Sequence, residues 1–220
     1  MIIAIDGPAG AGKSTIAKRV AKNKGFLYID TGAMYRALTL KVIESNVQVS
    51  DLSRIIQIAQ STTIDLIPNQ DGALKVLLDG RDVSKEVREP RITKLVSDIS
   101  KIKEVRQVML ELQRKFGRDS NSVLDGRDIG TVVFPEAEKK FYLDADFHER
   151  VSRRHKELLE LGQDVTFESV AADLSNRDRI DSTREVAPLK QAEDAIYLDT
   201  TNMTIDQVVE VVLNKINSYG

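Results

Sequence analysis

The sequence contains no cysteine and no tryptophan, and its only histidines are His148 and His155. The missing cysteines exclude disulfide frameworks, thiolate nucleophiles and zinc or iron–sulfur sites built on cysteine. Only the two histidines could offer imidazole to a metal ion. We therefore expect any bound metal to rest on oxygen ligands.

Long apolar runs and a strong charge imbalance are also missing. No run approaches the roughly 20 residues that a membrane-spanning helix needs, and Asp6 interrupts the N-terminal segment before a signal-peptide core could form. Lys and Arg total 32 against 34 for Asp and Glu, a formal charge of −2, which argues against a polyanion-binding surface. We expect a cytoplasmic protein that binds neither membranes nor nucleic acid.

The strongest positive signal lies at the N-terminus. The apolar run 2–5 ends at Asp6 and is typical of a strand buried on both faces of a parallel sheet. The next residues match Gly-x-x-x-x-Gly-Lys-Ser/Thr, in which backbone amides and the lysine hold phosphates and the hydroxyl ligates magnesium. A helix opening directly afterwards points its N-terminus at the same anion. The predicted ATP-binding residues here are Gly7, Pro8, Ala9, Gly10, Ala11, Gly12, Lys13, Ser14 and Thr15.

This P-loop predicts a nucleoside triphosphate with Mg²⁺ as the cofactor, but it does not identify the phosphoryl acceptor. A GTPase would be expected to carry Asn-Lys-x-Asp. The two Asn-Lys pairs continue as Asn-Lys-Gly-Phe at 23–26 and Asn-Lys-Ile-Asn at 214–217. Neither matches the guanine-recognition motif.

Strand and helix patterns alternate along the 220 residues, of which 41% are hydrophobic. Strands are predicted at 26–29, 122–125, 139–143 and 195–198, and helices at 32–43, 51–61, 105–116 and 147–161, with Pro90 starting a helical region and Gly117 ending the 105–116 helix. A capping box, Thr204 with Gln207, predicts the last helix. The alternation predicts an α/β fold with a parallel sheet flanked by helices.

Residues 62–90 differ from this pattern. Ile64 and Leu66 are followed by the turn sequence Asn-Gln-Asp-Gly at 69–72 and then by Leu74, Val76, Leu77 and Leu78. This arrangement predicts an inserted antiparallel hairpin.

Three segments, 30–36, 125–131 and 177–184, combine arginine with acids and turn residues. Arginine binds phosphate through two parallel hydrogen bonds, and loops beyond the carboxyl ends of parallel strands line the ligand crevice. These segments predict a second anion site that faces the P-loop. An acceptor that already carries a phosphate is substantially ionised at neutral pH, because its second pKa is near 6. Catalysis would then need alignment and charge neutralisation rather than a general base.

Three stretches resemble the bacterial cytidylate kinase family: Asp-Thr-Gly-Ala-Met-Tyr-Arg at 30–36, Asp-Gly-Arg-Asp-Ile-Gly-Thr-Val-Val-Phe-Pro at 125–135 and Arg-Glu-Val-Ala-Pro-Leu at 184–189. The resemblance covers essentially the whole chain. It implies a P-loop NTPase fold with a small antiparallel β insertion and a helical lid, and transfer of the γ-phosphate of ATP to CMP or dCMP. The expected single domain comprises a core (about 1–30, 118–147 and 190–220), an acceptor-binding region (about 31–117) and a lid (about 148–185).

The same resemblance implies a set of substrate-binding residues. It assigns the CMP phosphate to Arg36, Arg127 and Arg184, the sugar to Arg177 and Asp181, and the cytosine to Ser97, Arg106 and Asp128, with Thr31 also contacting the substrate. Lys13, Arg127 and Arg184 are the expected catalytic residues. Cytosine offers an amino donor to an aspartate and ring acceptors to an arginine. Uracil carries a carbonyl in place of the amino group, so UMP is predicted to be a much poorer substrate.

The predicted lid helix is rich in basic residues. We expect Arg150 and Arg154 to contact ATP phosphates, and His155 and Lys156 to belong to a solvated face. On the same helix, Glu149 is spaced to pair with Arg153. Closure of such a lid would exclude water, which competes as a phosphoryl acceptor.

Two acidic segments need separate treatment. Asp125, with Ser14, is a candidate to bind magnesium through water, although an acid at a strand end also serves as a turn or helix cap.

Leu-Asp-Gly-Arg-Asp occurs twice, at 78–82 and 124–128. Only the second copy follows a candidate core strand, so Arg81 in the first copy is interpreted as a turn residue.

Two other functions remain open. A P-loop kinase could act on another small acceptor, such as a different nucleoside monophosphate. A nucleotide-sensing switch could bind ATP and recruit a partner, but it would not need a second arginine pocket. No heptad pattern or apolar surface stripe is evident, so we expect a monomer.

Overall fold

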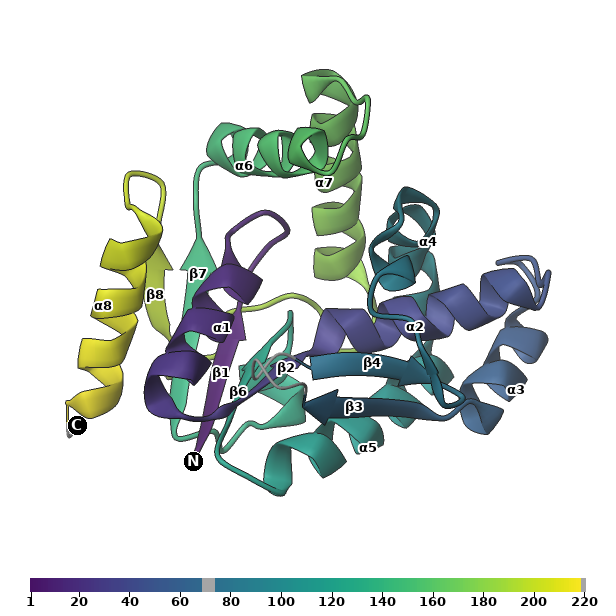
Figure 1. Ribbon diagram of the computed structural model, residues 1–220, viewed down its shortest axis with the longest axis horizontal. Coiled ribbons are helices and arrows are strands. Elements are labelled where there is room, and N and C mark those ends of the chain that lie inside the picture. Colours follow the sequence, from purple (N-terminus) through teal and green to yellow (C-terminus); the bar gives the residue numbers. More distant parts are fainter. Residues whose placement is uncertain (69–73, 219–220) are drawn as a thin grey trace.

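The computed structural model describes residues 1–68 and 74–218, and its centre is a five-stranded parallel sheet (Figure 1). The strands are β1 (Ile2–Asp6), β2 (Leu27–Asp30), β6 (Ser122–Asp125), β7 (Lys139–Asp144) and β8 (Ile196–Asp199), in the order β2-β6-β1-β7-β8. All neighbours are parallel. Central β1 is buried on both faces, as its apolar run predicts. The predicted α/β class is confirmed.

Helices cover both faces of this sheet. The helices of the chain are α1 (Lys13–Lys24), α2 (Thr31–Glu44), α3 (Leu52–Ser61), α4 (Pro90–Ser100), α5 (Lys103–Arg118), α6 (Phe147–Glu160), α7 (Phe167–Thr183) and α8 (Ile205–Asn217), and four of them pack on the sheet. Ile3 and Ile5 pack with α1 and α8 on one face, whereas Ala4 and Leu124 pack with α2 and α5 on the other. The predicted capping box of Thr204 and Gln207 opens α8.

The structure corrects one helix prediction and adds one helix. Gly117 does not end α5 but lies inside it, where a Cβ would come within 2.6 Å of the Phe134 ring. The glycine is needed for close packing rather than for a turn. The sequence pattern also did not single out α7, because its buried apolar residues are only Val170 and Leu174.

The insertion forms a second, antiparallel sheet. Its strands are β3 (Ile64–Pro68), β4 (Leu74–Leu78) and the short β5 (Arg81–Asp82). The predicted hairpin is confirmed with one extra strand, while its predicted turn at 69–72 lies outside the described residues. Ile64, Val76 and Leu78 are buried in the same core cluster as α2, so the insertion is packed on the helix that follows β2.

Helices α6 and α7 lie beyond the carboxyl edge of the sheet, above the P-loop (Figure 1). A small apolar cluster of Ala9, Val151, Val170 and Leu174 joins them to it. No helix within 1–68 and 74–218 is long and apolar enough to cross a lipid bilayer. The division of the chain into core, acceptor-binding region and lid stays a prediction.

Candidate active site

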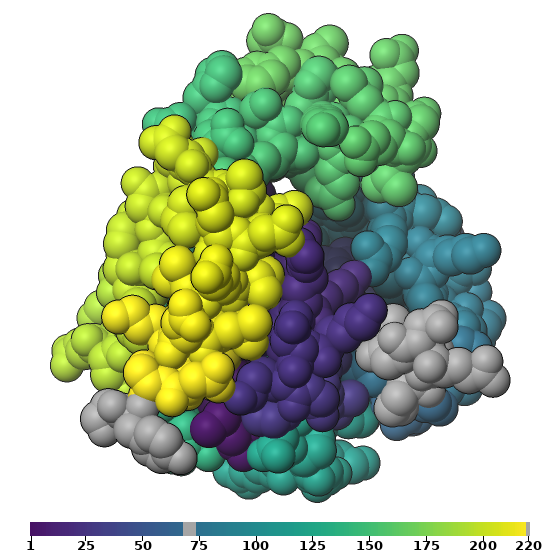
Figure 2. All heavy atoms as spheres, turned by 60° about the vertical axis from the view of Figure 1, so that its left-hand side comes forward, coloured from purple at the N-terminus to yellow at the C-terminus, as the bar shows by residue number. Residues whose placement is uncertain are grey.

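A cavity of about 690 Å³ opens at the carboxyl edge of the parallel sheet. Its walls come from the P-loop, the start of α2, the loop after β6, and helices α4, α6 and α7. In the space-filling view, α6 and α7 form the green cap over the purple atoms of α1, with a hollow between them (Figure 2). The predicted P-loop and the three predicted arginine segments therefore meet at one cavity, where two phosphate-bearing ligands could face each other.

The P-loop takes the shape that its glycines permit. A Cβ on Gly7 would come within 1.9 Å of the Leu143 carbonyl oxygen, and Gly12 has φ +83° at the start of α1. Both positions exclude ordinary side chains. Residues 9–15 line the cavity, so the helix N-terminus and its free amides face the space where phosphates would bind.

Lys13 is buried within this loop. Its Nζ donates a hydrogen bond to the Pro8 carbonyl oxygen at 2.6 Å. Burial, together with the positive charge of Arg127, holds the pKa of Lys13 well below its usual value. A phosphate beside Lys13 would stabilise its charged form.

Ser14 and Asp125 form the pair predicted to hold magnesium. Ser14 Oγ donates to Asp125 Oδ2 at 2.8 Å, and the Tyr28 hydroxyl donates to Oδ1 at 2.8 Å. Burial and the negative charge of Asp30 raise the pKa of Asp125, so a cation here would favour its ionised form.

The donor chemistry of this pair fits Mg²⁺. A hydroxyl and a carboxylate are hard oxygen ligands, and Mg²⁺ usually keeps several waters and completes its shell with substrate phosphates. No group of three or more potential metal-binding His, Cys, Asp or Glu residues occurs in the part of the chain that the structure describes. A Mg²⁺ site that nucleotide phosphates complete agrees with the two oxygen ligands of this pair and with the lack of a larger ligand cluster in the described residues.

Three arginines of the predicted acceptor site are held by carboxylates. Arg36 pairs with Asp30 at 3.0 Å, and Arg127 Nε donates to Asp181 Oδ2 at 2.9 Å. Arg184 pairs with Asp181 at 3.5 Å and Asp128 at 3.6 Å, and its Nε donates to the Ala187 carbonyl oxygen at 2.7 Å. All three guanidinium-bearing residues line the cavity. Their acidic partners fix the side chains before any phosphate binds.

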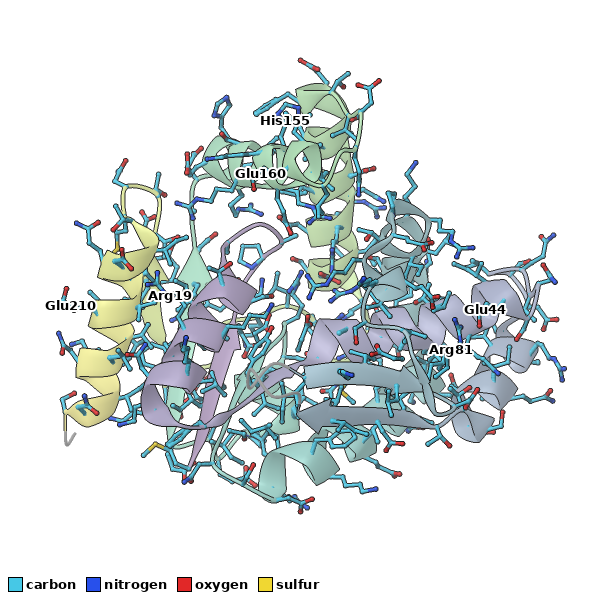
Figure 3. The ribbon with its side chains drawn as sticks, in the orientation of Figure 1. Arg19, Glu44, Arg81, His155, Glu160 and Glu210 are labelled. Carbon is cyan, nitrogen blue, oxygen red and sulfur yellow. The ribbon has the colours of Figure 1, made fainter. Side chains whose placement is uncertain are left out.

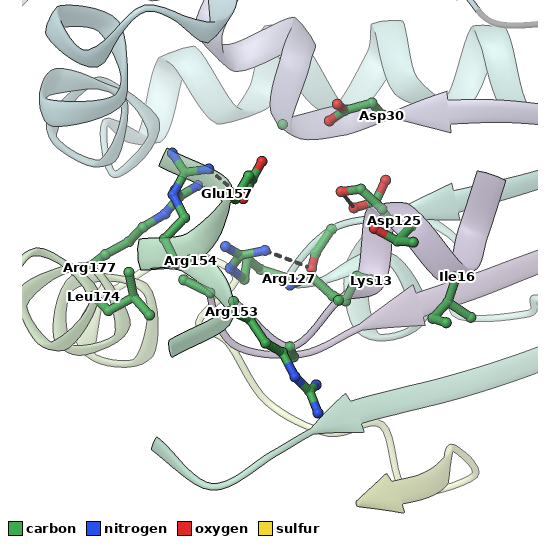
Figure 4. Close-up of a pocket in the computed structure, with 18 of the residues that line it drawn as sticks. Lys13, Ile16, Asp30, Asp125, Arg127, Arg153, Arg154, Glu157, Leu174 and Arg177 are labelled. Atoms are coloured by element: carbon green, nitrogen blue, oxygen red, sulfur yellow. Dashed lines mark hydrogen bonds and ion pairs between the residues drawn. The ribbon is translucent and has the colours of Figure 1, made fainter. Parts of the chain in front are cut away.

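Arg177 forms no such carboxylate pair within the described residues, and its buried Nε–H, like Nη2 of Arg184 and Nε of Arg106, has no hydrogen-bond partner there. Burial and the neighbouring charge of Arg127 lower its pKa to about 10. Figure 4 shows Arg177 and Arg154 extending from α7 and α6 into the region of the cavity where Arg127 and Lys13 lie. This gathering of positive charge is costly on its own, and an anion would relieve the repulsion.

The three residues predicted to read the base also converge. Arg106 Nη2 donates to Asp128 Oδ2 at 2.5 Å and Nη1 donates to the Ser100 carbonyl oxygen at 3.1 Å. The Arg106 guanidinium lies 5.5 Å from the centroid of the Tyr35 ring, and Ser97 is buried in the same wall. The paired aspartate and arginine present an acceptor and donors on one side of the cavity.

The expectation that Arg150 contacts ATP phosphates does not fit its placement. Arg150 does not line the cavity, and its guanidinium donates to the carbonyl oxygens of Ala9 (2.8 Å) and Ala145 (3.1 Å). It also pairs with Asp178 at 2.5 Å, and Asp178 Oδ1 accepts the Ala9 N–H at 3.0 Å. Arg150 therefore fixes the P-loop from behind.

The other basic residues of α6 are placed individually. Arg154 lines the cavity and pairs with Glu157 at 2.7 Å, and Arg153 forms the predicted pair with Glu149 at 2.8 Å. His155 is not simply solvated, since its Nε2 lies 3.0 Å from the Val165 carbonyl oxygen. Lys156 is exposed, as expected, and borders the cavity.

Arg81 occupies the outer end of the insertion, beside Glu44 (Figure 3). It is exposed, pairs with Glu44 at 2.5 Å and Glu86 at 2.7 Å, and does not line the cavity. The two copies of Leu-Asp-Gly-Arg-Asp thus occupy unrelated environments.

Several cavity residues escaped the sequence analysis. Arg88, Lys18 and Arg153 line the wall, and each belongs to a stretch whose charge pattern is also typical of an ordinary exposed surface.

Asp6 was noted in the sequence only as the end of a strand. Its burial raises its pKa to about 7, a signal that needs the folded structure.

The parallel sheet, the P-loop and the facing arginine-lined cavity define a kinase-type protein of the P-loop NTPase fold. A model of the cytidylate kinase family matches residues 3–218. The chain belongs to the cytidylate kinase family.

Individual relatives agree over nearly the full length. The chain is 51% identical over 217 residues to the cytidylate kinase of Clostridioides difficile (strain 630), covering 99% of this chain and 98% of that protein. It is 50% identical over 213 residues to the cytidylate kinase of Carboxydothermus hydrogenoformans, covering 97% and 96%. A crystal structure of an uncharacterized protein from Eubacterium ventriosum ATCC 27560 has a TM-score of 0.56 at 13% identity, covering 100% of this chain and 99% of that one. That last likeness concerns the fold alone.

Proposed function

We propose that this chain transfers the γ-phosphate of ATP to CMP or dCMP, giving ADP and CDP or dCDP. The observation that carries the proposal is the arginine-lined wall opposite Lys13, in which Arg177 has an unpartnered, buried Nε–H. Membership of the cytidylate kinase family supports the same conclusion. An ATP-binding switch without an acceptor would have no use for this second cationic wall.

Transfer proceeds in line from ATP at the P-loop to the CMP phosphate. The acceptor oxygen is already ionised at neutral pH, so no protein group needs to remove a proton. Lys13 neutralises charge on the transferred group, and Arg127 and Arg184 hold and neutralise the acceptor phosphate. Arg36 adds a further contact to that phosphate, while Arg177 and Asp181 bind the sugar.

Ser14 and, through water, Asp125 would hold a Mg²⁺ ion bound with ATP, which would supply charge neutralisation at the phosphates. On the donor side, the amides of residues 10–15 bind phosphate and Arg154 reaches it from α6. For Arg150 we replace the expected ATP contact with a different role, in which it positions the P-loop.

Base selectivity comes from Asp128, Arg106 and Ser97. Asp128 accepts a hydrogen bond from the cytosine amino group, and Arg106 donates to a ring acceptor. UMP would place a carbonyl oxygen against the Asp128 carboxylate, leaving buried acceptors unpaired. We place the reaction in the cytoplasm, where ATP and nucleoside monophosphates are available, and we expect a monomer, which sedimentation analysis would test.

The test is ADP release from ATP with CMP, dCMP, UMP, AMP or shikimate as acceptor. We expect high kcat/KM for CMP or dCMP and at least about 100-fold less for UMP, since a site that pairs with a polar group rejects an analogue lacking it. In Asp128→Asn the CMP:UMP ratio should collapse toward parity.

Comparable rates with CMP and UMP in the unchanged protein would refute the base assignment. A higher rate with another acceptor would replace CMP as the substrate. ATP binding without any acceptor-dependent ADP release would favour the nucleotide-sensing switch.

A further inference from the structure

The loop after β6 continues into a short π-helical turn, Ile129–Val133. π-Helical turns are rare and usually occur at functional sites. Here the turn directly follows Arg127 and Asp128, two of the residues after β6 that line the cavity. Its position therefore decides where these side chains lie.

A carboxylate holds the beginning of this turn. Asp6 accepts hydrogen bonds from the amides of Ile129 (2.9 Å, Oδ1) and Gly130 (2.7 Å, Oδ2). Asp6 is only 5% exposed and ends β1, immediately before the P-loop. A Cβ on Gly130 would lie 3.1 Å from Lys140 Cδ and in ordinary contact with Asp6 Oδ2, at 3.4 Å.

A guanidinium holds the end of the same turn. Arg114 on α5 donates from Nε to the Val133 carbonyl oxygen and from Nη2 to the Val132 carbonyl oxygen, both at 2.9 Å. Negative charge thus meets the first amides and positive charge meets the last carbonyls, which matches the dipole of the turn. Two elements on opposite sides of the loop fix it at both ends.

Asp128 is tied directly to this turn. Its carbonyl oxygen accepts from the amides of Val132 (2.9 Å) and Val133 (3.1 Å), while its carboxylate pairs with Arg106 in the cavity. Asp6 and Arg114 do not line that cavity. The turn is the contact through which both residues reach Asp128.

We propose that Asp6 and Arg114 are positioning residues that clamp the turn 129–133 and thereby set the selectivity for the base through Asp128. This proposal rests on the proposed reading of cytosine by Asp128. It adds a structural link between the strand that ends at the P-loop and the wall that binds the acceptor.

The main test replaces Arg114 by methionine, with Lys115→Met as the matched control. Lys115 is the next residue of α5, is exposed, and loses the same charge. Loss of the two hydrogen bonds in Arg114→Met should raise KM for CMP about tenfold and lower the CMP:UMP ratio of kcat/KM about tenfold. ATP affinity, measured without CMP, should change by less than about twofold, and the control should match the unchanged protein.

Arg114→Lys keeps the charge but can reach only one carbonyl at a time, so its CMP:UMP ratio should lie between those of the unchanged protein and Arg114→Met. If Arg114→Met fails to fold, Arg114→Lys takes its place in the test. Asp6→Asn keeps the side-chain shape but exchanges one acceptor for a donor, and it should lower the ratio as well. Melting temperatures recorded alongside ensure that every assay uses folded protein.

Unchanged CMP kinetics in Arg114→Met would overturn the proposal. So would parallel losses of ATP and CMP affinity with an unaltered CMP:UMP ratio, because that is the signature of general destabilisation. The variant Asp128→Asn distinguishes a failure of the clamp proposal from a failure of the proposed base recognition. If Asp128→Asn abolishes selectivity while Arg114→Met does not, only the clamp is wrong; if Asp128→Asn has no effect, the base assignment itself fails.

Discussion

The donor and acceptor walls of the cavity both suit phosphate, but they are built from different groups. The donor wall consists of backbone amides and Lys13 within residues 7–15 of one loop. The acceptor wall consists of guanidinium groups from α2, α7, the loop after β6 and the residue after α7. The first depends on local backbone geometry, whereas the second depends on how distant segments pack. Substitutions should therefore affect the two walls separately.

Lys13→Met is expected to give the largest effect. Lys13 is the single side-chain cation of the P-loop, and its loss removes a donor aimed at the transferred phosphoryl group. We expect kcat to fall roughly 10³-fold, with CMP affinity, measured calorimetrically without ATP, nearly unchanged. A proportional loss of CMP affinity would show that the two walls are not separable.

The acceptor wall can be tested with the repeated pentapeptide. Arg127→Ala removes charge-assisted hydrogen bonds to the acceptor phosphate and should lower kcat/KM for CMP about 100-fold. Arg81→Ala, in the other copy of Leu-Asp-Gly-Arg-Asp, breaks only exposed pairs with Glu44 and Glu86 and should leave kcat/KM unchanged. Steady-state kinetics with varied CMP measures both. The reverse ranking of the two variants would contradict our assignment of the acceptor wall.

The same contrast explains what sequence could predict. The P-loop lies within one short segment between a strand and a helix, so its residues were identified together. The α/β class was predictable for the same reason, because each strand pattern and each helix pattern lies within one short segment. For the acceptor residues, the arginine segments indicated an anion site, but individual roles came from family resemblance, because no local pattern shows that Arg106 reaches Asp128.

Contacts between distant segments account for what was missed. Asp6, Asp30 and Asp125 all end parallel strands, yet Asp6 binds the amides of the π-helical turn, Asp30 caps α2, and Asp125 bonds Ser14. The partners of Asp6 and Asp125 are distant in the sequence and only the fold brings them close, whereas Asp30 bonds the nearby Ala33. Gly117 likewise looked like a helix terminator, although its role depends on Phe134, which lies beyond the next strand.

The smallest effect that we predict concerns the link between the two walls. Arg150 and Asp178 bond the carbonyl and amide of Ala9, so helices α6 and α7 hold the donor loop from behind. Arg150→Met should raise KM for ATP about tenfold and lower the hydrogen-exchange protection of the Ala9 amide, without nucleotide, by a similar factor. KM for CMP should change little.

Arg154→Met is the matched control, because Arg154 lies on the same helix and pairs with Glu157 rather than with the P-loop. It should raise KM for ATP while leaving exchange at Ala9 unaltered, since it is proposed to contact the nucleotide directly. If Arg150→Met weakens ATP binding while hydrogen exchange at the Ala9 amide stays normal, that result would support the direct phosphate contact predicted from the sequence. Lost protection at Ala9 in that variant would instead show that a charged residue on α6 acts on ATP through the backbone it holds.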